Sequence, residues 1–229
     1  MAKKNELAPA DGFEKVENAM NNAEGFVESH QKELLIGFVA VIAVVALYFL
    51  LSLKVWQPRE ENAKSEIVKA EQMFAIDSFQ VALDGKEDEF LGFLDIIDEY
   101  GSTSTGNLAK AYAGICYKNL EQYDEAIKYL NKFSGDDVLV SPAIVGAVAD
   151  CYWDMKEESK AVSSYLKAAE LANNDLLTPL YKKRAAMCQI SLGKNAEAIK
   201  LLESILTDYP YSAELPEVQK YLGIAKNAK

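Results

Sequence analysis

The sequence predicts an all-α protein in which a single N-terminal transmembrane helix precedes an α-solenoid of stacked helical hairpins. The first observation behind this prediction is a stretch without charged residues, Leu34 to Leu53. The second is a motif that recurs three times in the second half of the chain. We therefore expect five regions, which are a short head (1–33), a transmembrane anchor (34–54), a linking helix with a degenerate first repeat (59–106), three repeats (107–212) and a C-terminal capping helix (213–229).

The uncharged stretch has the length of a membrane span. Its 20 residues would extend about 30 Å as a helix, which matches the hydrocarbon core of a bilayer. Lys32 and Lys54 stand at its two ends, and Tyr48 and Trp56 lie where interfacial aromatic residues are common. A cleaved signal peptide would have a shorter apolar region followed by a small-residue cleavage site, which this sequence lacks. We expect a retained anchor.

The head is compatible with a short amphipathic helix. Asp11 and Glu14 have the spacing of a capping box. Apolar residues recur behind them on one helical face, at Phe13, Val16, Met20 and Val27. Such a helix would dock on a partner or lie at the membrane surface, and a solvated stalk fits the same residues.

Two further helices are expected between the anchor and the repeats. The segment Arg59 to Phe79 places apolar residues on one stripe, at Ala63, Ile67, Ala70 and Phe74. A loop at Leu83 to Lys86 ends this helix. A second apolar segment begins at Phe90 and closes at Tyr100-Gly101, where glycine stops the helix.

The recurring motif predicts three helical hairpins. A small residue, at Gly114, Ala149 and Ala186, recurs at spacings of 35 and then 37 residues and marks a close helix crossing. Twelve residues later an alanine marks the returning helix, at Ala126, Ala161 and Ala198. The period resembles the 34 residues of tetratricopeptide repeats. Pro210 closes the third unit, and Leu215 to Ala225 reads as a capping helix.

The composition argues against catalysis and against nucleic-acid binding. The net charge is −11, and the densest basic run is only Lys182-Lys183-Arg184. The single histidine, His30, adjoins the anchor, so it offers no nucleophilic pair. The cysteines occupy one equivalent position in the three repeats, at Cys116, Cys151 and Cys188, which indicates small core residues. We expect no enzyme, no metal, no cofactor and no small-molecule substrate.

A concave groove is the remaining candidate site, because in tetratricopeptide repeats the first helix of each unit lines that face. The register assigns to it nine residues, namely Ala111, Ile115, Lys118, Gly146, Asp150, Trp153, Leu180, Lys183 and Met187. Repeats that clamp acidic chaperone C-termini need lysine and asparagine where this chain has Ala111 and Ile115, so no such clamp is expected. An extended or helical apolar peptide fits this lining, as does a merely solvated face with an exposed Trp153.

Head, anchor and repeats together resemble the YfgM-type membrane-anchored tetratricopeptide proteins, which are ancillary subunits of the bacterial SecYEG translocon. The resemblance implies a cytoplasmic head, a single-pass anchor in the inner membrane and a periplasmic repeat domain. It also implies protein partners, namely the Sec translocon, periplasmic chaperones or exported chains. Counting Lys54, Arg59, Lys64 and Lys69 against Lys15 and Lys32 favours the opposite orientation, but long domains translocate despite flanking charge. The alternative function is a structural scaffold that assembles another envelope membrane complex.

Overall fold

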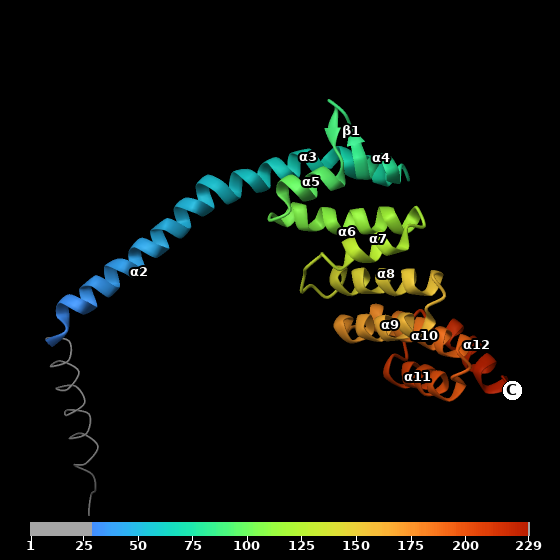
Figure 1. The fold of residues 1–229 in the computed structure, drawn as a ribbon. Helices are drawn as coiled ribbons and strands as arrows, with labels where there is room; N and C mark the ends of the chain where they lie inside the picture. Colours follow the sequence, from blue (N-terminus) through green and yellow to red (C-terminus); the bar gives the residue numbers. More distant parts are fainter. Residues whose placement is uncertain (1–28, 229) are drawn as a thin grey trace, which may run out of the picture. The chain divides into compact units, whose positions relative to one another are not determined.

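The computed structural model describes residues 29–228 and is helical almost throughout (Figure 1). The chain divides between Gln57 and Pro58 into two compact units. The first unit contains helix α2 (Gln31–Leu51), which is followed by a π-helical turn, η1 (Ser52–Trp56). The amphipathic helix predicted for the head falls within residues 1–28, outside the described residues. The all-α prediction is confirmed.

Helix α2 presents its apolar side chains to its surroundings on every side. None of its residues is buried, although most of them are large and hydrophobic. Near its end the ring of Tyr48 lies edge-on to that of Trp56, with the ring centroids 5.5 Å apart. Within the described residues, one helical segment, Gln31–Ala75, is long and apolar enough to cross a membrane.

The second unit opens with two helices, α3 (Gln57–Ala75) and α4 (Phe79–Asp84). A hairpin of two short strands follows, β1 (Gly85–Lys86) and β2 (Phe90–Leu91), each two residues long, and then α5 (Phe93–Tyr100). The strands are antiparallel. The predicted single helix from Arg59 to Phe79 was wrong at its end, because Asp77 takes a left-handed conformation (φ 59°) and stops α3. Phe90 and Leu91 were predicted to be helical and instead pair with β1.

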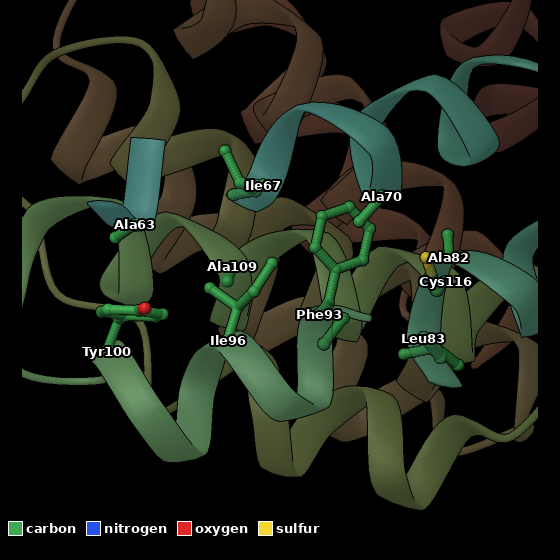
Figure 2. Close-up of a cluster of buried hydrophobic side chains, with 11 residues drawn as sticks. Ala63, Ile67, Ala70, Ala82, Leu83, Phe93, Ile96, Tyr100, Ala109 and Cys116 are labelled. Carbon is green, nitrogen blue, oxygen red and sulfur yellow. The ribbon is translucent and has the colours of Figure 1, made fainter. Parts of the chain in front are cut away.

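Helix α3 forms part of the hydrophobic core of this unit and is not a free linker. Its buried residues Ala63, Ile67 and Ala70 pack with residues of α5 and of α6 (Ser104–Asn119) (Figure 2). Phe93 of α5 is fully buried and its ring stacks on that of Tyr112 of α6, with centroids 4.9 Å apart. The predicted apolar stripe of this helix is therefore confirmed at its three buried positions.

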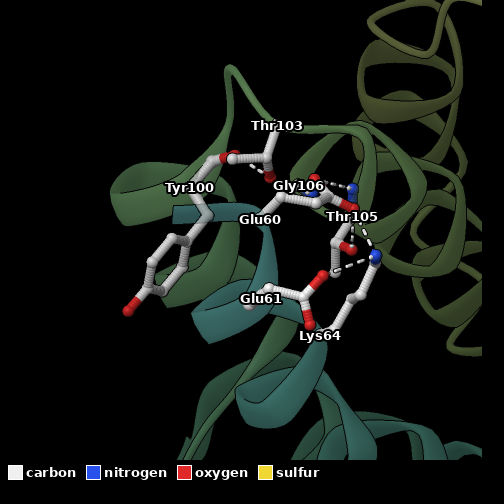
Figure 3. Close-up of polar contacts among 7 residues, drawn as sticks. All are labelled: Glu60, Glu61, Lys64, Tyr100, Thr103, Thr105 and Gly106. Carbon is white, nitrogen blue, oxygen red and sulfur yellow. Dashed lines mark hydrogen bonds and ion pairs between the residues drawn. The ribbon is translucent and has the colours of Figure 1, made fainter. Parts of the chain in front are cut away.

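Polar contacts fix the beginning of α3 against the beginning of α6 (Figure 3). Glu60 accepts hydrogen bonds from the backbone N–H of Thr105 at 3.3 Å and from its hydroxyl at 2.9 Å. Burial alone would raise the pKa of Glu60, but the hydrogen bonds from Thr105 and Ser104, together with the charge of Lys64, outweigh burial and leave that pKa below its ordinary value. Arg59 donates to the carbonyl of Glu99 at the end of α5. The chain thus enters the second unit beside the turn that joins α5 to α6.

Three helical hairpins and a last helix complete the unit. Their bounds are α6 with α7 (Tyr123–Leu130), α8 (Val140–Asp154) with α9 (Glu158–Ala172), α10 (Leu177–Ser191) with α11 (Asn195–Asp208), and α12 (Leu215–Asn227). Each helix packs chiefly on its neighbours in sequence, as in Figure 1, where the hairpins follow one another along the stack.

The small residues at the helix crossings are fully enclosed. Ala149 and Ala186 are 0% exposed, and Gly146 of α8 lies against α10 so closely that a Cβ atom would stand 2.4 Å from the ring of Tyr181. Within each hairpin the connecting turn has a residue in the left-handed region, at Glu121, Lys156 and Gly193. Only the third of these is glycine, so the sequence marks that turn more strongly than the other two.

Candidate functional site

The nine residues expected in the groove divide into buried and accessible groups. Ala111 is 5% exposed, Gly146 is buried against α10, and Lys183 is 6% exposed, so these three belong to the interior. Ile115 and Leu180 are half-buried and pack against the edges of two core clusters. Three of the nine residues are therefore inaccessible to a partner.

Three of the expected residues meet in one cleft between the second and third hairpins. Asp150 and Trp153 come from α8 and Met187 comes from α10, and together they line a cleft of about 200 Å³. Tyr165 of α9, Arg184 and Cys188 complete its walls. Residues of two successive first helices therefore meet at one surface.

Asp150 is the centre of a polar network that connects all three hairpins. Its Oδ2 accepts a hydrogen bond from Lys118 of α6 at 2.9 Å. Its Oδ1 accepts from the hydroxyl of Tyr165 at 2.6 Å and from the guanidinium of Arg184 at 2.6 Å. Two cations and a phenol therefore share one carboxylate, which is fully used as an acceptor, and the network carries a net charge of +1.

The network fixes the charge states of Tyr165 and Arg184. Burial and the hydrogen bond to Asp150 raise the pKa of Tyr165, so this hydroxyl stays protonated and acts as a donor. For Arg184, burial alone would lower the pKa, but the charge of Asp150 outweighs it and the pKa lies above its ordinary value. These side chains hold the cleft in shape and carry fixed charge states.

Sequence reasoning missed Arg184 and Tyr165 as members of this site. A usable signal existed, because Lys118, Asp150 and Arg184 lie about one repeat apart and alternate in charge sign. Opposite charges at equivalent positions of stacked first helices are placed to form ion pairs between repeats. The role of Tyr165 depends on the return of α9 against α8, which charge spacing alone does not give.

Lys183 faces away from the cleft toward the last helix. It is buried and forms ion pairs with Glu214 and Glu217 at the start of α12. Burial alone would lower the pKa of Lys183, but the hydrogen bonds that it donates to Glu214 and Glu217, with the charges of these carboxylates, outweigh burial and the pKa is raised. This residue connects α12 to the third hairpin. It was predicted to line the groove and instead lies in the interior.

The cysteines are small interior side chains, as expected. All three are free and buried. Burial raises the pKa of Cys116 and of Cys188 to about 12 and that of Cys151 to about 11, which disfavours the reactive thiolate. Within residues 29–228, no three histidine, cysteine, aspartate or glutamate side chains come together in an arrangement that could hold a metal ion.

Comparison with known protein families agrees with the arrangement of the hairpins. Models of the tetratricopeptide repeat match residues 106–133, 144–175 and 184–212. These ranges correspond to the hairpins α6–α7, α8–α9 and α10–α11. No curated protein matches the chain. Because stacked repeats of this kind present extended concave surfaces to other chains, they indicate protein partners. The C-terminal part of the chain therefore contains three tetratricopeptide repeats.

Proposed function

We propose that this protein is a membrane-anchored scaffold without enzymatic activity, which binds proteins or peptides through the cleft between its second and third repeats. The observation that carries the proposal is the cleft itself, in which Trp153 and Met187 stand beside the network of Asp150 and Arg184. We further propose that α2 holds this scaffold in the bacterial inner membrane, near the Sec translocon, where it assists exported proteins together with periplasmic chaperones.

The size of the cleft favours a single side chain of a larger partner over a small molecule. Ligand pockets for free small molecules usually enclose about 300–1,000 Å³, whereas this cleft encloses about 200 Å³. An aromatic ring and a thioether provide an adaptable apolar wall. The charge of Asp150 is already shared by Lys118 and Arg184, so the cleft offers no free carboxylate to a ligand, and the donors of Arg184 can bind a peptide carbonyl.

Membrane anchoring is supported by the surface of α2. Twenty-one residues extend about 32 Å as a helix, and every side chain is exposed. Apolar surface of this extent is unfavourable in water and is stable within hydrocarbon. The inner membrane, the periplasmic side and the Sec translocon enter the proposal through the resemblance to YfgM-type proteins.

Photocrosslinking tests the binding role. Trp153→benzoylphenylalanine places the crosslinker in the cleft, and Lys167→benzoylphenylalanine on the exposed side of α9 is the matched control. We expect exported chains or translocon subunits to be captured from position 153 and not from position 167. Equal capture at both positions would refute binding in the cleft. A structural assembly scaffold, in contrast, would tolerate a charge in the cleft such as Met187→Asp without loss of its assembly.

Cysteine labelling tests the proposed orientation separately. Lys200→Cys introduces an accessible thiol on α11, whereas the native cysteines are buried and contribute little background. A reagent that passes the outer membrane but not the inner membrane should label this thiol in intact cells. Labelling only after the inner membrane is opened would place the repeats in the cytoplasm and contradict the periplasmic assignment.

A further inference from the structure

One edge of the second unit is formed by the turns that join successive hairpins. These turns are residues 101–103, 131–139, 173–176 and 209–214, and we call this surface the joining edge. The helices α6, α8, α10 and α12 all begin at the joining edge. Helix α3 begins there as well, because Glu60 contacts Thr105 and Arg59 contacts the carbonyl of Glu99. The chain therefore passes from the anchor into the second unit at this edge.

Hydrogen bonds connect the turns of the joining edge side by side. Asn107 at the start of α6 donates to the carbonyl of Ser134 at 2.7 Å and accepts from its backbone N–H at 3.1 Å. Asn174 in the next turn donates to the carbonyl of Val138 at 3.0 Å. The edge is thus a continuous surface from the beginning of α3 to the beginning of α10.

Large hydrophobic side chains project from these turns into solvent. Val138 is 61% exposed, Leu139 51%, Leu176 67% and Tyr211 98%. The turns of the opposite edge are residues 76–78, 120–122, 155–157 and 192–194. Among the exposed large hydrophobic residues of the described chain, one, Ile76, falls in those turns. Of the two edges, the joining edge therefore exposes more apolar surface in its turns.

Local hydrogen bonds hold two of these exposed residues in place. Asp137 Oδ1 accepts from the backbone N–H groups of Leu139 at 2.9 Å and of Val140 at 2.5 Å. Asn174 Oδ1 accepts from the N–H groups of Leu176 at 3.0 Å and of Leu177 at 2.8 Å. Both contacts satisfy free N–H groups at the start of a helix. The side chains of Leu139 and Leu176 are thus presented outward by fixed turns.

We propose that the joining edge rests in the headgroup region of the bilayer, with Val138, Leu139, Leu176 and Tyr211 in contact with lipid. This inference rests on the proposed membrane anchoring by α2. Lipid is the favoured occupant because the apolar stretch ends at Leu53, six residues before Arg59 enters the joining edge. Exposed leucine and tyrosine side chains suit the boundary between headgroups and acyl chains.

The charge of the joining edge specifies the kind of lipid. Its four turns contain one lysine, Lys132, against three acidic residues, Asp136, Asp137 and Asp175, besides Glu214, which pairs with Lys183. Anionic headgroups attract basic surfaces and repel acidic ones. The contact is therefore apolar in character and favours a zwitterionic lipid surface.

Fluorescence quenching in vesicles tests the contact with the full-length chain. Leu176→Cys and Leu139→Cys on the joining edge each receive an environment-sensitive fluorophore. Lys194→Cys, in an exposed turn of the opposite edge, is the matched control, and Val44→Cys reports on the anchor. The labelled proteins are reconstituted in phosphatidylcholine vesicles that contain a headgroup spin-labelled lipid, and circular dichroism checks that each variant is folded.

We expect the spin label to cause a loss of fluorescence at positions 176 and 139 and little loss at position 194. Replacing part of the phosphatidylcholine with phosphatidylglycerol should weaken the loss at 176, and a stronger loss would overturn the zwitterionic assignment. In parallel vesicles that carry an acyl-chain spin-labelled lipid instead, quenching of the fluorophore at position 44 without headgroup quenching at 176 and 139 would overturn the membrane contact alone. A label at position 176 whose emission is blue-shifted but not quenched would indicate that protein covers the edge, and this result would also overturn the membrane contact. Absence of quenching by the acyl-chain spin label at position 44 would overturn both the anchor and the contact.

Discussion

Gly146→Ala tests the close packing of the second repeat against the third. The new Cβ atom would lie 2.4 Å from Cε1 and 2.6 Å from Cζ of Tyr181. Tyr181 is 5% exposed and its ring stacks with that of Tyr165, so it has no free space to move into. Normal carbon–carbon contact requires α8 and α10 to move apart by about 1 Å. The substitution should therefore weaken the interface between the repeats.

A matched control isolates the energy of this clash. Gly223 lies in the middle of α12, and a Cβ atom there would meet nothing within 4 Å. Alanine is favoured over glycine in a helix by about 1 kcal/mol at both positions, and overpacking lowers the stability by about 1–3 kcal/mol at position 146 alone. We expect Gly223→Ala to raise the free energy of unfolding and to exceed Gly146→Ala by about 1–3 kcal/mol.

Urea unfolding of the full-length chain in detergent, followed by circular dichroism, measures both variants under identical conditions. The comparison between them is more secure than either absolute value, because α2 contributes equally to the two signals. Equal stabilisation by Gly146→Ala and Gly223→Ala would refute the close approach of α8 to α10.

Three further predictions concern single residues. Asp150→Ala should lower the free energy of unfolding by about 2 kcal/mol, because it removes the shared acceptor of the network; a change below about 0.5 kcal/mol in urea unfolding would contradict that role. The pKa of Glu60 is lower in the folded chain than its ordinary 4.5, so its stabilisation is present above this pH and is lost as the pH falls through the folded value. Glu60→Gln should therefore lower the unfolding midpoint most near neutral pH and progressively less in acid, and a difference independent of pH would count against the contact with Thr105. Burial raises the pKa of Cys151 to about 11, so iodoacetamide should modify this thiol only as fast as the chain unfolds. Mass spectrometry measures the modification, and rapid modification of the folded chain would contradict the burial of this thiol.

Helical periodicity predicted the repeats well, because each first helix needs small residues where it crosses a neighbour. Ala149 and Ala186 are fully buried, and the equivalent cysteines are buried beside them. The hairpin of β1 and β2 was missed, since its formation depends on a close backbone approach. A Cβ atom at Gly92 would stand 2.1 Å from the carbonyl oxygen of Leu83, a contact between segments that no periodic pattern reports.

The candidate site was predicted only in part. Register placed Asp150, Trp153 and Met187 on one surface, and these three line the cleft. It could not tell that Lys183 turns toward α12, because the carboxylates of Glu214 and Glu217 that attract it belong to a segment outside the repeat pattern. A register fixes which face a residue occupies, whereas the choice between groove and interior depends on partners from neighbouring elements.

Intrinsic fluorescence of Trp153 tests the central claim most directly, namely that a segment of another protein occupies the cleft. The chain has two tryptophans, so Trp56→Phe leaves Trp153 as the sole emitter. Titration with a permanently unfolded polypeptide should shift its emission to shorter wavelength and saturate, and Met187→Asp should weaken this binding. An emission spectrum that does not change during the titration, or an equal response in the Met187→Asp variant, would contradict the account.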